Sequence, residues 1–359
     1  MKNKTKCIVC LKKIDRFKIN LPIFEHHNFF TTSLKGELNK CYSCHMIFRD
    51  NKINYNFFKS RNYKDKNNDN KLISTDNIVT SRSSVLSQIL DEEIKSKSNL
   101  NVLEIGCGKG YLLNNLSKIF KKSNFFGHDI GDYSKYKTFL KKKISFIKNK
   151  KFNFKNESLD IIIVSHTLNY FVNPLREIKK YKKFLKKNGY LMIVTPDIKK
   201  NIFYTLMSDQ KIITTKYNLT NLLLLCGFSV SFKNHENLTR ELICISRPNF
   251  KKKPILKKKD LTLESNLKKL YLIKKKLLKI KSNELSVIGT NINAAFVDEV
   301  LGRKIKRFVN DFIIKKENFR GKKIIHRKKL KINEVLINCI SRRGNFLKTN
   351  NKNKIINIF

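Results

Sequence analysis

The sequence predicts an α/β protein whose central part is a parallel β-sheet covered by helices on both faces. From residue 101 onward, short apolar runs alternate with segments of helical spacing, which is typical of repeated strand–helix units. A glycine-rich loop follows the first of these runs, and two Cys-x-x-Cys pairs precede the alternating region. A shorter α/β stretch follows it. The predicted parts of this 359-residue chain are 1–60, 80–248 and 284–345.

The composition favours a folded cytoplasmic protein. Hydrophobic residues make up 41% of the chain, which is enough to build a buried core. No apolar run approaches the ~20 residues that cross a bilayer, and the basic N-terminus lacks the apolar stretch of a secretion signal. We therefore expect no membrane span. The sequence leaves the oligomeric state open.

The formal net charge of +49 permits two interpretations. A cationic groove would attract the phosphates of a nucleic acid. However, the lysines are spread over the whole chain and outnumber the arginines, although arginine is the better bidentate phosphate ligand. Abundant Asn, Ile and Phe are typical of an AT-rich genome. Composition bias is therefore the preferred explanation, and a nucleic acid is a disfavoured partner.

Four of the eight cysteines form the pairs Cys7-Ile-Val-Cys10 and Cys41-Tyr-Ser-Cys44. Without a secretory signal, such pairs indicate a tetrahedral zinc site rather than disulfides. Four thiolates would close the coordination shell, so the expected Zn²⁺ is structural and not catalytic. The alternative is two unrelated pairs of thiols. Three nearby histidines could each replace a cysteine: His26, His27 and His45.

The remaining elements follow from the spacing of apolar residues. In the central part, strands are expected at 102–105, 124–128, 159–165, 190–195 and from 228, and helices at 83–94, 111–120, 174–185 and 219–226. Residues 59–77 predict a linker or mobile loop, and residues 249–282 a solvated linker helix. In the last part, strands are expected at 285–288, 304–309 and 334–339 around a helix at 292–301, with frayed residues after 345.

The glycine-rich loop carries the chemistry of the predicted site. Gly106, Gly108 and Gly110 follow a strand and begin a helix, where the backbone must turn sharply and let a ligand approach closely. Glu104 lies in the strand, two residues before the first glycine. Asp129 ends the next strand and is placed to accept both hydroxyls of a ribose, although a helix N-cap is its alternative role.

A second group of candidates lies where the strand at 159–165 ends. Ser165 and His166 occupy a position at which a substrate could face a cofactor, and Ser165 is included among the cofactor-binding candidates. His166 could deprotonate a hydroxyl or an amine near neutral pH. A lone histidine is more often a structural hydrogen-bonding residue, which is the alternative.

The segment from Val102 to Gly110 resembles motif I of class I S-adenosylmethionine methyltransferases, and the resemblance continues to about residue 232. With a four-cysteine module in front and an α/β unit behind, the whole chain is similar to the zinc-containing methyltransferases of sugar biosynthesis, including deoxysugar C-methyltransferases. The resemblance implies a Rossmann-like methyltransferase core, a small N-terminal zinc-binding module and a C-terminal Rossmann-like α/β unit.

The resemblance also implies roles for individual residues. The loop with Gly106 and Gly108 would pass under the methionine part of S-adenosylmethionine, with Glu104 near its amino group. Asp129 would hold the ribose, and Ile130 would flank the adenine. The implied methyl acceptor is a small molecule, with a nucleotide-linked sugar of surface polysaccharide or secondary-metabolite biosynthesis as the leading candidate.

The sequence departs from this family where the acceptor is activated. Members that methylate a sugar carbon carry His-Glu-His where this chain has Ser208-Asp209-Gln210. Many relatives carry His-x-Leu-Glu-His where this chain has His166-Thr-Leu-Asn-Tyr170. In the C-terminal unit only Gly289 occupies the phosphate-loop position. The acceptor atom and the catalytic base therefore stay open.

Three other functions are alternatives to this prediction. An RNA-directed methyltransferase is one alternative, although the Asp/Asn-Pro-Pro-Tyr/Phe and Pro-Cys motifs of base-modifying enzymes are absent from the sequence. An NAD-dependent oxidoreductase is disfavoured because Tyr111 stands at the third glycine of G-x-G-x-x-G. A non-catalytic zinc-containing binding protein with a degenerate methyltransferase fold is the third alternative.

Overall fold

The computed structural model describes residues 6–25, 29–32, 36–50, 59, 71–73, 79–94, 98–131, 133, 144–147, 153–249, 256, 259–310, 317–340 and 353–358. The chain divides into two compact units. The first consists of Met1–Phe17, Leu38–Lys200 and Gln210–Asp260, and the second of Lys18–Glu37, Asn201–Asp209 and Leu261–Phe359.

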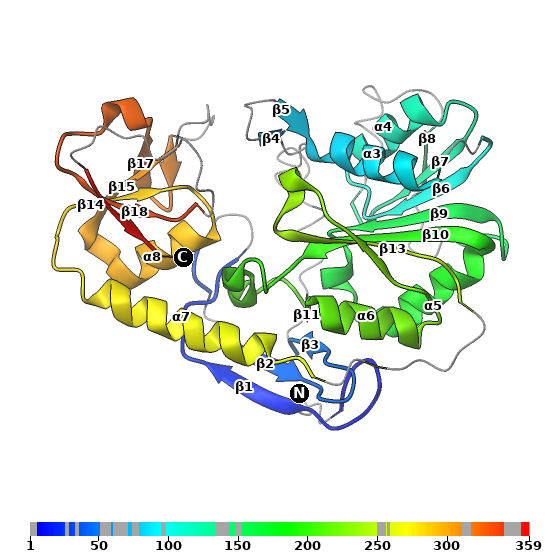
Figure 1. Ribbon diagram of the computed structural model, residues 1–359, viewed down its shortest axis with the longest axis horizontal. Coiled ribbons are helices and arrows are strands. Elements are labelled where there is room, and N and C mark those ends of the chain that lie inside the picture. Colours follow the sequence, from blue (N-terminus) through cyan, green and yellow to red (C-terminus); the bar gives the residue numbers. More distant parts are fainter. Residues whose placement is uncertain are drawn as a thin grey trace. The chain divides into compact units, whose positions relative to one another are not determined.

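The first unit is built around a seven-stranded sheet in the order β12-β13-β10-β9-β6-β7-β8 (Figure 1). Neighbouring strands from β10 to β8 are parallel. Strand β13 pairs antiparallel with both of its neighbours, β10 and β12. The strands are β6 (Asn101–Ile105), β7 (Asn124–His128), β8 (Ile144–Ile147), β9 (Leu159–Ser165), β10 (Leu185–Pro196), β12 (Ser231–Lys233) and β13 (Glu241–Ser246).

Helices cover both faces of this sheet (Figure 1). In β9, Ile161 and Ile163 belong to the hydrophobic cluster of α3 and α4, whereas Ile162 and Val164 belong to that of α5 and α6. A strand that is buried on both faces reads as a continuous apolar run, which is the pattern of a parallel sheet. The helices are α3 (Arg82–Ile94), α4 (Tyr111–Ile119), α5 (Pro174–Phe184) and α6 (Lys216–Leu225).

The predicted fold class is confirmed, with local corrections. Strands β8 and β13 were not predicted, and β10 already begins at Leu185, where the sequence indicated the end of a helix and a turn. Residues Lys71–Ile73 form β4, which pairs with β5 (Val79–Ser81), so this part of the predicted linker is a strand. The short helices of the central region are η2 (Leu168–Tyr170), η3 (Ile202–Leu206) and η4 (Glu236–Leu238).

The N-terminal region forms a four-stranded sheet in the order β1-β2-β3-β11. Its last strand comes from far along the chain, since β11 pairs antiparallel with β3. The four-cysteine region therefore shares a sheet with residues that follow β10. The strands are β1 (Asp15–Ile19), β2 (Gly36–Lys40), β3 (Ile47–Phe48) and β11 (Ile212–Ile213).

The second unit contains a six-stranded sheet in the order β16-β17-β15-β14-β18-β19, parallel except for β16. Its parallel strands follow the order third, second, first, fourth, fifth, which is that of a doubly wound fold. The elements are α7 (Thr262–Leu278), β14 (Leu285–Ile288), α8 (Ile292–Leu301), η5 (Gly302–Lys304), β15 (Ile305–Val309), β16 (Asn318–Phe319), β17 (Lys322–Ile325), η6 (Arg327–Lys329), β18 (Val335–Asn338) and β19 (Lys354–Asn357).

Two expectations for this unit are wrong. Helix α7 is not a solvated linker, because Leu263, Leu270 and Leu277 are buried on its inner face, and it contacts α8. The residues after 345 are not frayed throughout, because β19 pairs in parallel with β18. In both cases a composition rich in lysine or asparagine concealed an interaction with a neighbouring helix or strand.

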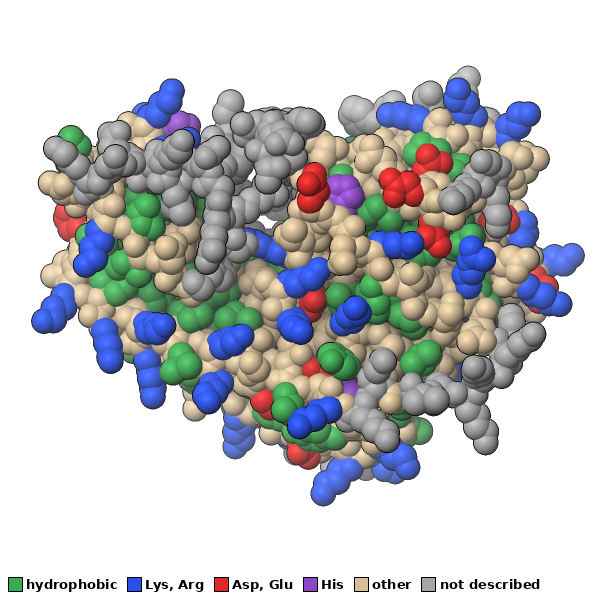
Figure 2. Space-filling model, in the orientation of Figure 1, with side chains coloured by type: hydrophobic (Ala, Val, Ile, Leu, Met, Phe, Trp, Pro, Cys, Tyr) green, Lys and Arg blue, Asp and Glu red, His purple; other side chains and the backbone are tan. Residues whose placement is uncertain are grey.

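Lysine and arginine side chains lie over many elements of the face that Figure 2 shows, rather than over a single one. This distribution agrees with the spread of lysines along the sequence. No described helix combines the length and the hydropathy that a membrane crossing requires.

Candidate active site and cysteine cluster

The loop after β6 turns through three glycines with positive φ. Gly106, Gly108 and Gly110 have φ values of 74°, 52° and 78°, which disfavour residues that carry a Cβ. At Gly106 there is also no space, because a Cβ would lie 1.9 Å from Oγ1 of Thr167. The Gly106 amide donates to the carbonyl of His128 over 2.7 Å, which ties the loop to the end of β7. The loop backbone is therefore held close to the carboxyl edge of the sheet.

Asp129 holds this loop from the neighbouring strand end. Its Oδ2 accepts a hydrogen bond from the Gly108 amide at 2.9 Å, and its Oδ1 accepts one from the Gly131 amide at 2.8 Å. The structure thus brings together two residues that the sequence singled out separately. Each carboxylate oxygen has a second lone pair, so these bonds leave acceptor capacity for a ligand hydroxyl.

Two acidic residues, Glu104 and Asp129, act on the same buried thiol at this edge of the sheet. Glu104 is 4% exposed and lies in register with Gly127 of β7 and Ile163 of β9. The pKa of the buried Cys107 thiol is raised well above its ordinary value, first by burial and then by the charges of Asp129 and Glu104. Ile130 is 40% exposed beside them. A positively charged ligand would be stabilised at this position.

His166 follows β9 directly and adopts an unusual backbone conformation. Its φ of +51° lies in the left-handed region, and its amide donates to the carbonyl of Val194 in β10 over 2.8 Å. Such a conformation costs roughly 1–2 kcal/mol in a residue other than glycine. The next residue, Thr167, donates from Oγ1 to the carbonyl of Ser165. This turn places Ser165 and His166 at the same carboxyl edge as the glycine loop.

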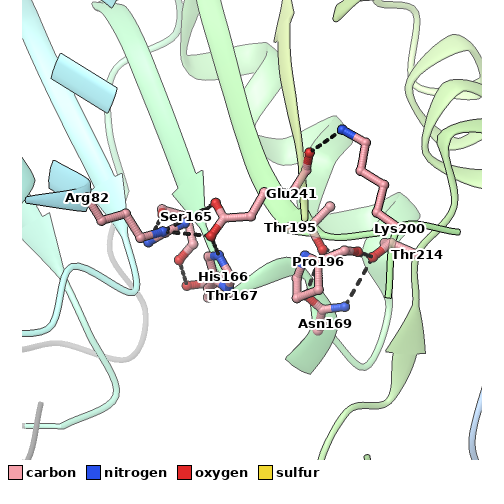
Figure 3. Close-up of polar contacts among 10 residues, drawn as sticks. All are labelled: Arg82, Ser165, His166, Thr167, Asn169, Thr195, Pro196, Lys200, Thr214 and Glu241. Atoms are coloured by element: carbon pink, nitrogen blue, oxygen red, sulfur yellow. Dashed lines mark hydrogen bonds and ion pairs between the residues drawn. The ribbon is translucent and has the colours of Figure 1, made fainter. Parts of the chain in front are cut away.

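The sequence did not predict the partners of His166 (Figure 3). Nε2 of His166 lies 3.1 Å from Oε1 of Glu241, the first residue of β13. The guanidinium of Arg82, the first residue of α3, donates from Nε and Nη2 to the same carboxylate at 3.0 and 2.8 Å. Arg82 also donates from Nη1 to Oγ of Ser165 at 3.3 Å. We refer to Arg82, His166 and Glu241 as the edge triad.

The carboxyl group of Glu241 is ionised over a wide pH range. Burial acts to raise its pKa, but the charges and hydrogen bonds of His166 and Arg82 outweigh that effect and hold the pKa well below its usual range. A carboxylate with such neighbours is a weak base. In the edge triad, the imidazole of His166 is therefore the group that can accept a proton near neutral pH.

The lowered pKa of Glu241 predicts a pH-dependent contribution to stability. Because its pKa is lower in the folded than in the unfolded chain, the ion pair stabilises fully above the unfolded value of about 4.3, and this contribution is lost as the pH falls below it. At pH 7, Glu241→Gln should lower the free energy of unfolding by about 1–3 kcal/mol. Urea unfolding at pH 7 and pH 3.5 should show the difference between wild type and variant shrinking in acid. An equal difference at both values would contradict this account.

A buried polar network connects η2, which follows the loop after β9, to neighbouring segments (Figure 3). Asn169 donates from Nδ2 to the carbonyl of Ile212 at 2.7 Å and accepts from Oγ1 of Thr195 at 2.8 Å. Thr214 donates from Oγ1 to the carbonyl of Pro196. These bonds join η2, the end of β10 and the segment after β11, so the backbone that carries His166 has a rigid base.

The four paired cysteines meet in one cluster, as the sequence predicted. Their sulfur atoms all lie within 4.8 Å of one another, with Cys7 and Cys44 at 3.5 Å and Cys10 and Cys41 at 3.4 Å. Both Cys-x-x-Cys turns end in a residue with positive φ, Leu11 in one and His45 in the other. Two independent turns of the same geometry thus present the four sulfurs to a common centre.

The histidines near this cluster have different outcomes. His45 is 2% exposed and does not belong to the four-residue cluster, so the expectation that it could replace a cysteine is not met. His26 and His27 lie outside the described residues. Asn221 of α6 donates from Nδ2 to the carbonyl of Cys44 at 3.2 Å, which connects the cluster to a helix of the central domain.

The comparisons with known proteins agree with this architecture. A family model described as a methyltransferase domain matches residues 80–222. The matched range contains β6, β7, β9, β10, the glycine loop and His166. The predicted methyltransferase core is confirmed at the level of this domain.

Individual relatives are similar over part of the chain. The malonyl-[acyl-carrier protein] O-methyltransferase of Bacillus cereus is 27% identical over 117 residues, which are 31% of this chain and 42% of that protein. The chain thus matches less than half the length of this curated relative. Among solved structures, a SAM-dependent methyltransferase from Aquifex aeolicus is 19% identical with a TM-score of 0.38, over 45% of this chain and 88% of that one. The plantazolicin methyltransferase BpumL in complex with SAH is 16% identical with a TM-score of 0.40, over 47% and 82%.

Proposed function

We propose that this chain is an S-adenosylmethionine-dependent methyltransferase that acts on a small molecule. The observation that carries the proposal is the bond between the Gly108 amide and Asp129, which joins the glycine loop to the next strand at the carboxyl edge of a methyltransferase domain. Ligands of open α/β sheets bind at that edge, where the loops after the strands leave a crevice.

The residues at this edge fit S-adenosylmethionine. The glycine loop would lie under the methionine part, Asp129 would accept from the ribose hydroxyls, and Ile130 would cover the adenine. The carboxylates of Glu104 and Asp129 suit a ligand that carries an ammonium and a sulfonium charge. When bound, this cofactor supplies a methyl group that a nucleophile can displace. Ser165 remains a candidate contact, and it shares Arg82 with Glu241.

The role of the protein is then to orient an acceptor and to take up its proton. Methyl transfer is an in-line displacement, so positioning of two reactants supplies most of the rate enhancement. His166, at the same edge of the sheet as the glycine loop, would accept the proton from a hydroxyl or carbon acid. A nucleotide-linked sugar remains our leading candidate for the acceptor, on the basis of the family resemblance.

The four-cysteine cluster would hold a structural Zn²⁺. Tetrahedral coordination with Zn–S bonds of about 2.3 Å places the sulfurs about 3.8 Å apart, which is close to the separations in the cluster. The contact with Cys41 raises the pKa of Cys7 to about 12 and also raises the pKa of Cys44, with burial acting in the same direction. A dication would offset the cost of bringing four thiolates together. The four thiolates would fill its coordination shell, so no position would remain for water.

Isothermal titration with S-adenosylhomocysteine tests the cofactor site directly. NAD and a short RNA are titrated separately for comparison. We expect saturable binding of S-adenosylhomocysteine alone. Asp129→Ala should weaken this binding by about 1–3 kcal/mol, because it removes a charged acceptor and releases the Gly108 amide. The exposed Asp91 on α3 provides the matched control, and Asp91→Ala should bind like the wild type.

Each other outcome of the titration favours a different function. Binding of RNA alone would favour the RNA-directed alternative. No binding of S-adenosylhomocysteine up to millimolar concentration would overturn the proposal and favour a zinc-containing binding protein. Equal affinity in the wild type and in Asp129→Ala would remove the ribose assignment but not the methyltransferase function.

A further inference from the structure

The edge triad joins a partly exposed histidine to an ion pair that is more deeply buried. Its members come from three elements that are distant in the sequence, since Arg82 and Glu241 are 159 residues apart. The Glu241 and Arg82 side chains are each 15% exposed, whereas that of His166 is 37% exposed. One side of the imidazole is thus held by a nearly buried ion pair, while part of the ring reaches the surface.

From this geometry we infer that Glu241 is the positioning residue of His166. With its carboxylate 3.1 Å from Nε2, Glu241 would favour the neutral tautomer that carries the proton on Nε2 and leaves the lone pair on Nδ1, as a carboxylate partner does for a catalytic histidine. This inference rests on the proposed methyltransferase function. It assigns the proton-accepting atom, Nδ1, and two supporting residues that no sequence motif indicated.

The acceptor gives its proton to Nδ1 of His166, and the electron pair of its oxygen or carbon forms the new bond to the methyl carbon. The electrons of the broken carbon–sulfur bond stay on sulfur. Glu241 stabilises the imidazolium that results, while its charge remains unchanged.

Arg82 disfavours transfer of the proton from His166 to Glu241. Its bidentate bond to Glu241 holds the carboxylate in one orientation, and its charge makes Glu241 a poor proton acceptor. Arg82 also opposes the positive charge on His166, so the two partners affect the basicity of the imidazole in opposite directions.

The test is a pH titration of the full-length chain with ¹⁵N-labelled histidine, followed by long-range ¹H–¹⁵N NMR. His166→Gln identifies the His166 signals among those of the seven histidines. In the wild type we expect the Nε2–H tautomer. In Glu241→Gln the titration midpoint of His166 should fall by about one pH unit or more, because an opposite charge within hydrogen-bonding distance is lost. In Arg82→Gln it should rise.

A matched control removes another paired carboxylate of the same unit. Glu93 lies on α3 and pairs with Lys233 at 2.6 Å, so Glu93→Gln should leave the His166 midpoint unchanged. The carboxylates of Glu104 and Asp129 at the same edge of the sheet are present in every variant and cannot explain the differences. If Glu241→Gln does not fold, the wild-type tautomer and the direction of the Arg82→Gln shift still test the role of Glu241.

Two results would overturn the inference. One is an Nδ1–H tautomer in the wild type, and the other is a His166 midpoint that Glu241→Gln does not move. A titration of the wild-type sample with S-adenosylhomocysteine separates this from the proposed function. If the wild type does not bind S-adenosylhomocysteine but His166 shows the expected tautomer and midpoint shifts, only the methyltransferase function is rejected. If it binds S-adenosylhomocysteine but His166 does not show them, only the role of Glu241 is rejected.

Discussion

Replacement of both Cys7 and Cys10 by serine is expected to abolish zinc binding and to destabilise the first unit by several kcal/mol. Zinc would couple its binding free energy to folding, because only the folded chain brings the four sulfurs together. Cys7 and Cys44 also belong to the hydrophobic cluster that contains Leu219 and Leu222 of α6. The loss should therefore extend into the methyltransferase domain.

The measurements are the metal content of the purified chain and its urea unfolding curve. The wild type should contain about one zinc per chain, as a four-thiolate site binds one ion. Cys226→Ser is the matched control, because Cys226 is a buried thiol of the same hydrophobic cluster outside the metal site. It should keep its zinc. Equal zinc content in the double variant and the wild type would reject the metal site.

Replacement of Gly106 by alanine should have the second largest effect. The left-handed conformation costs alanine about 1–2 kcal/mol, and the overlap with Thr167 adds about 1–3 kcal/mol. The backbone can relieve the overlap only by moving the glycine loop away from the end of β9. We therefore expect both a less stable domain and an affinity for S-adenosylhomocysteine that is lower by about tenfold or more.

Gly227 provides a control with the same backbone strain. Its φ of +76° is close to the +74° of Gly106, but its Cβ would meet mainly the flexible end of Lys182. Gly227→Ala should therefore show the conformational cost without a loss of affinity. Adding Thr167→Ala to Gly106→Ala should restore part of the stability, because it removes the two nearest atoms. If Gly106→Ala and Gly227→Ala lose the same stability and affinity, the overlap with Thr167 does not explain why glycine is needed at position 106.

Much of the fold could be predicted because its sequence signals are local. A continuous apolar run such as that of β9 predicts a strand buried on both faces, and the glycines after β6 predict a turn with positive φ. The two Cys-x-x-Cys pairs also carry their geometry within four residues each. Such patterns need no knowledge of the partner, since the spacing along the chain already restricts the local backbone.

The errors arose where burial depends on a distant segment. The lysine-rich α7 and the short β19, which follows a segment rich in lysine and asparagine, resemble solvated segments until the neighbouring helix or strand is known. β13 is short and begins with a charged residue, yet it pairs with β10 over six residues. Whether such a strand forms depends on an unpaired sheet edge elsewhere in the fold, and no local sequence pattern indicates where that edge lies.

The sequence by itself thus determined the α/β class, the glycine loop with Asp129 and the four metal-ligand candidates, because each depends on residues close together or on a regular strand–helix repeat. Only the tertiary structure decided that His166 meets Glu241 and Arg82. That contact requires β13 to pair antiparallel with β10 and α3 to begin beside β9. Both depend on the packing of segments that are far apart in the chain, and no spacing of residues encodes them.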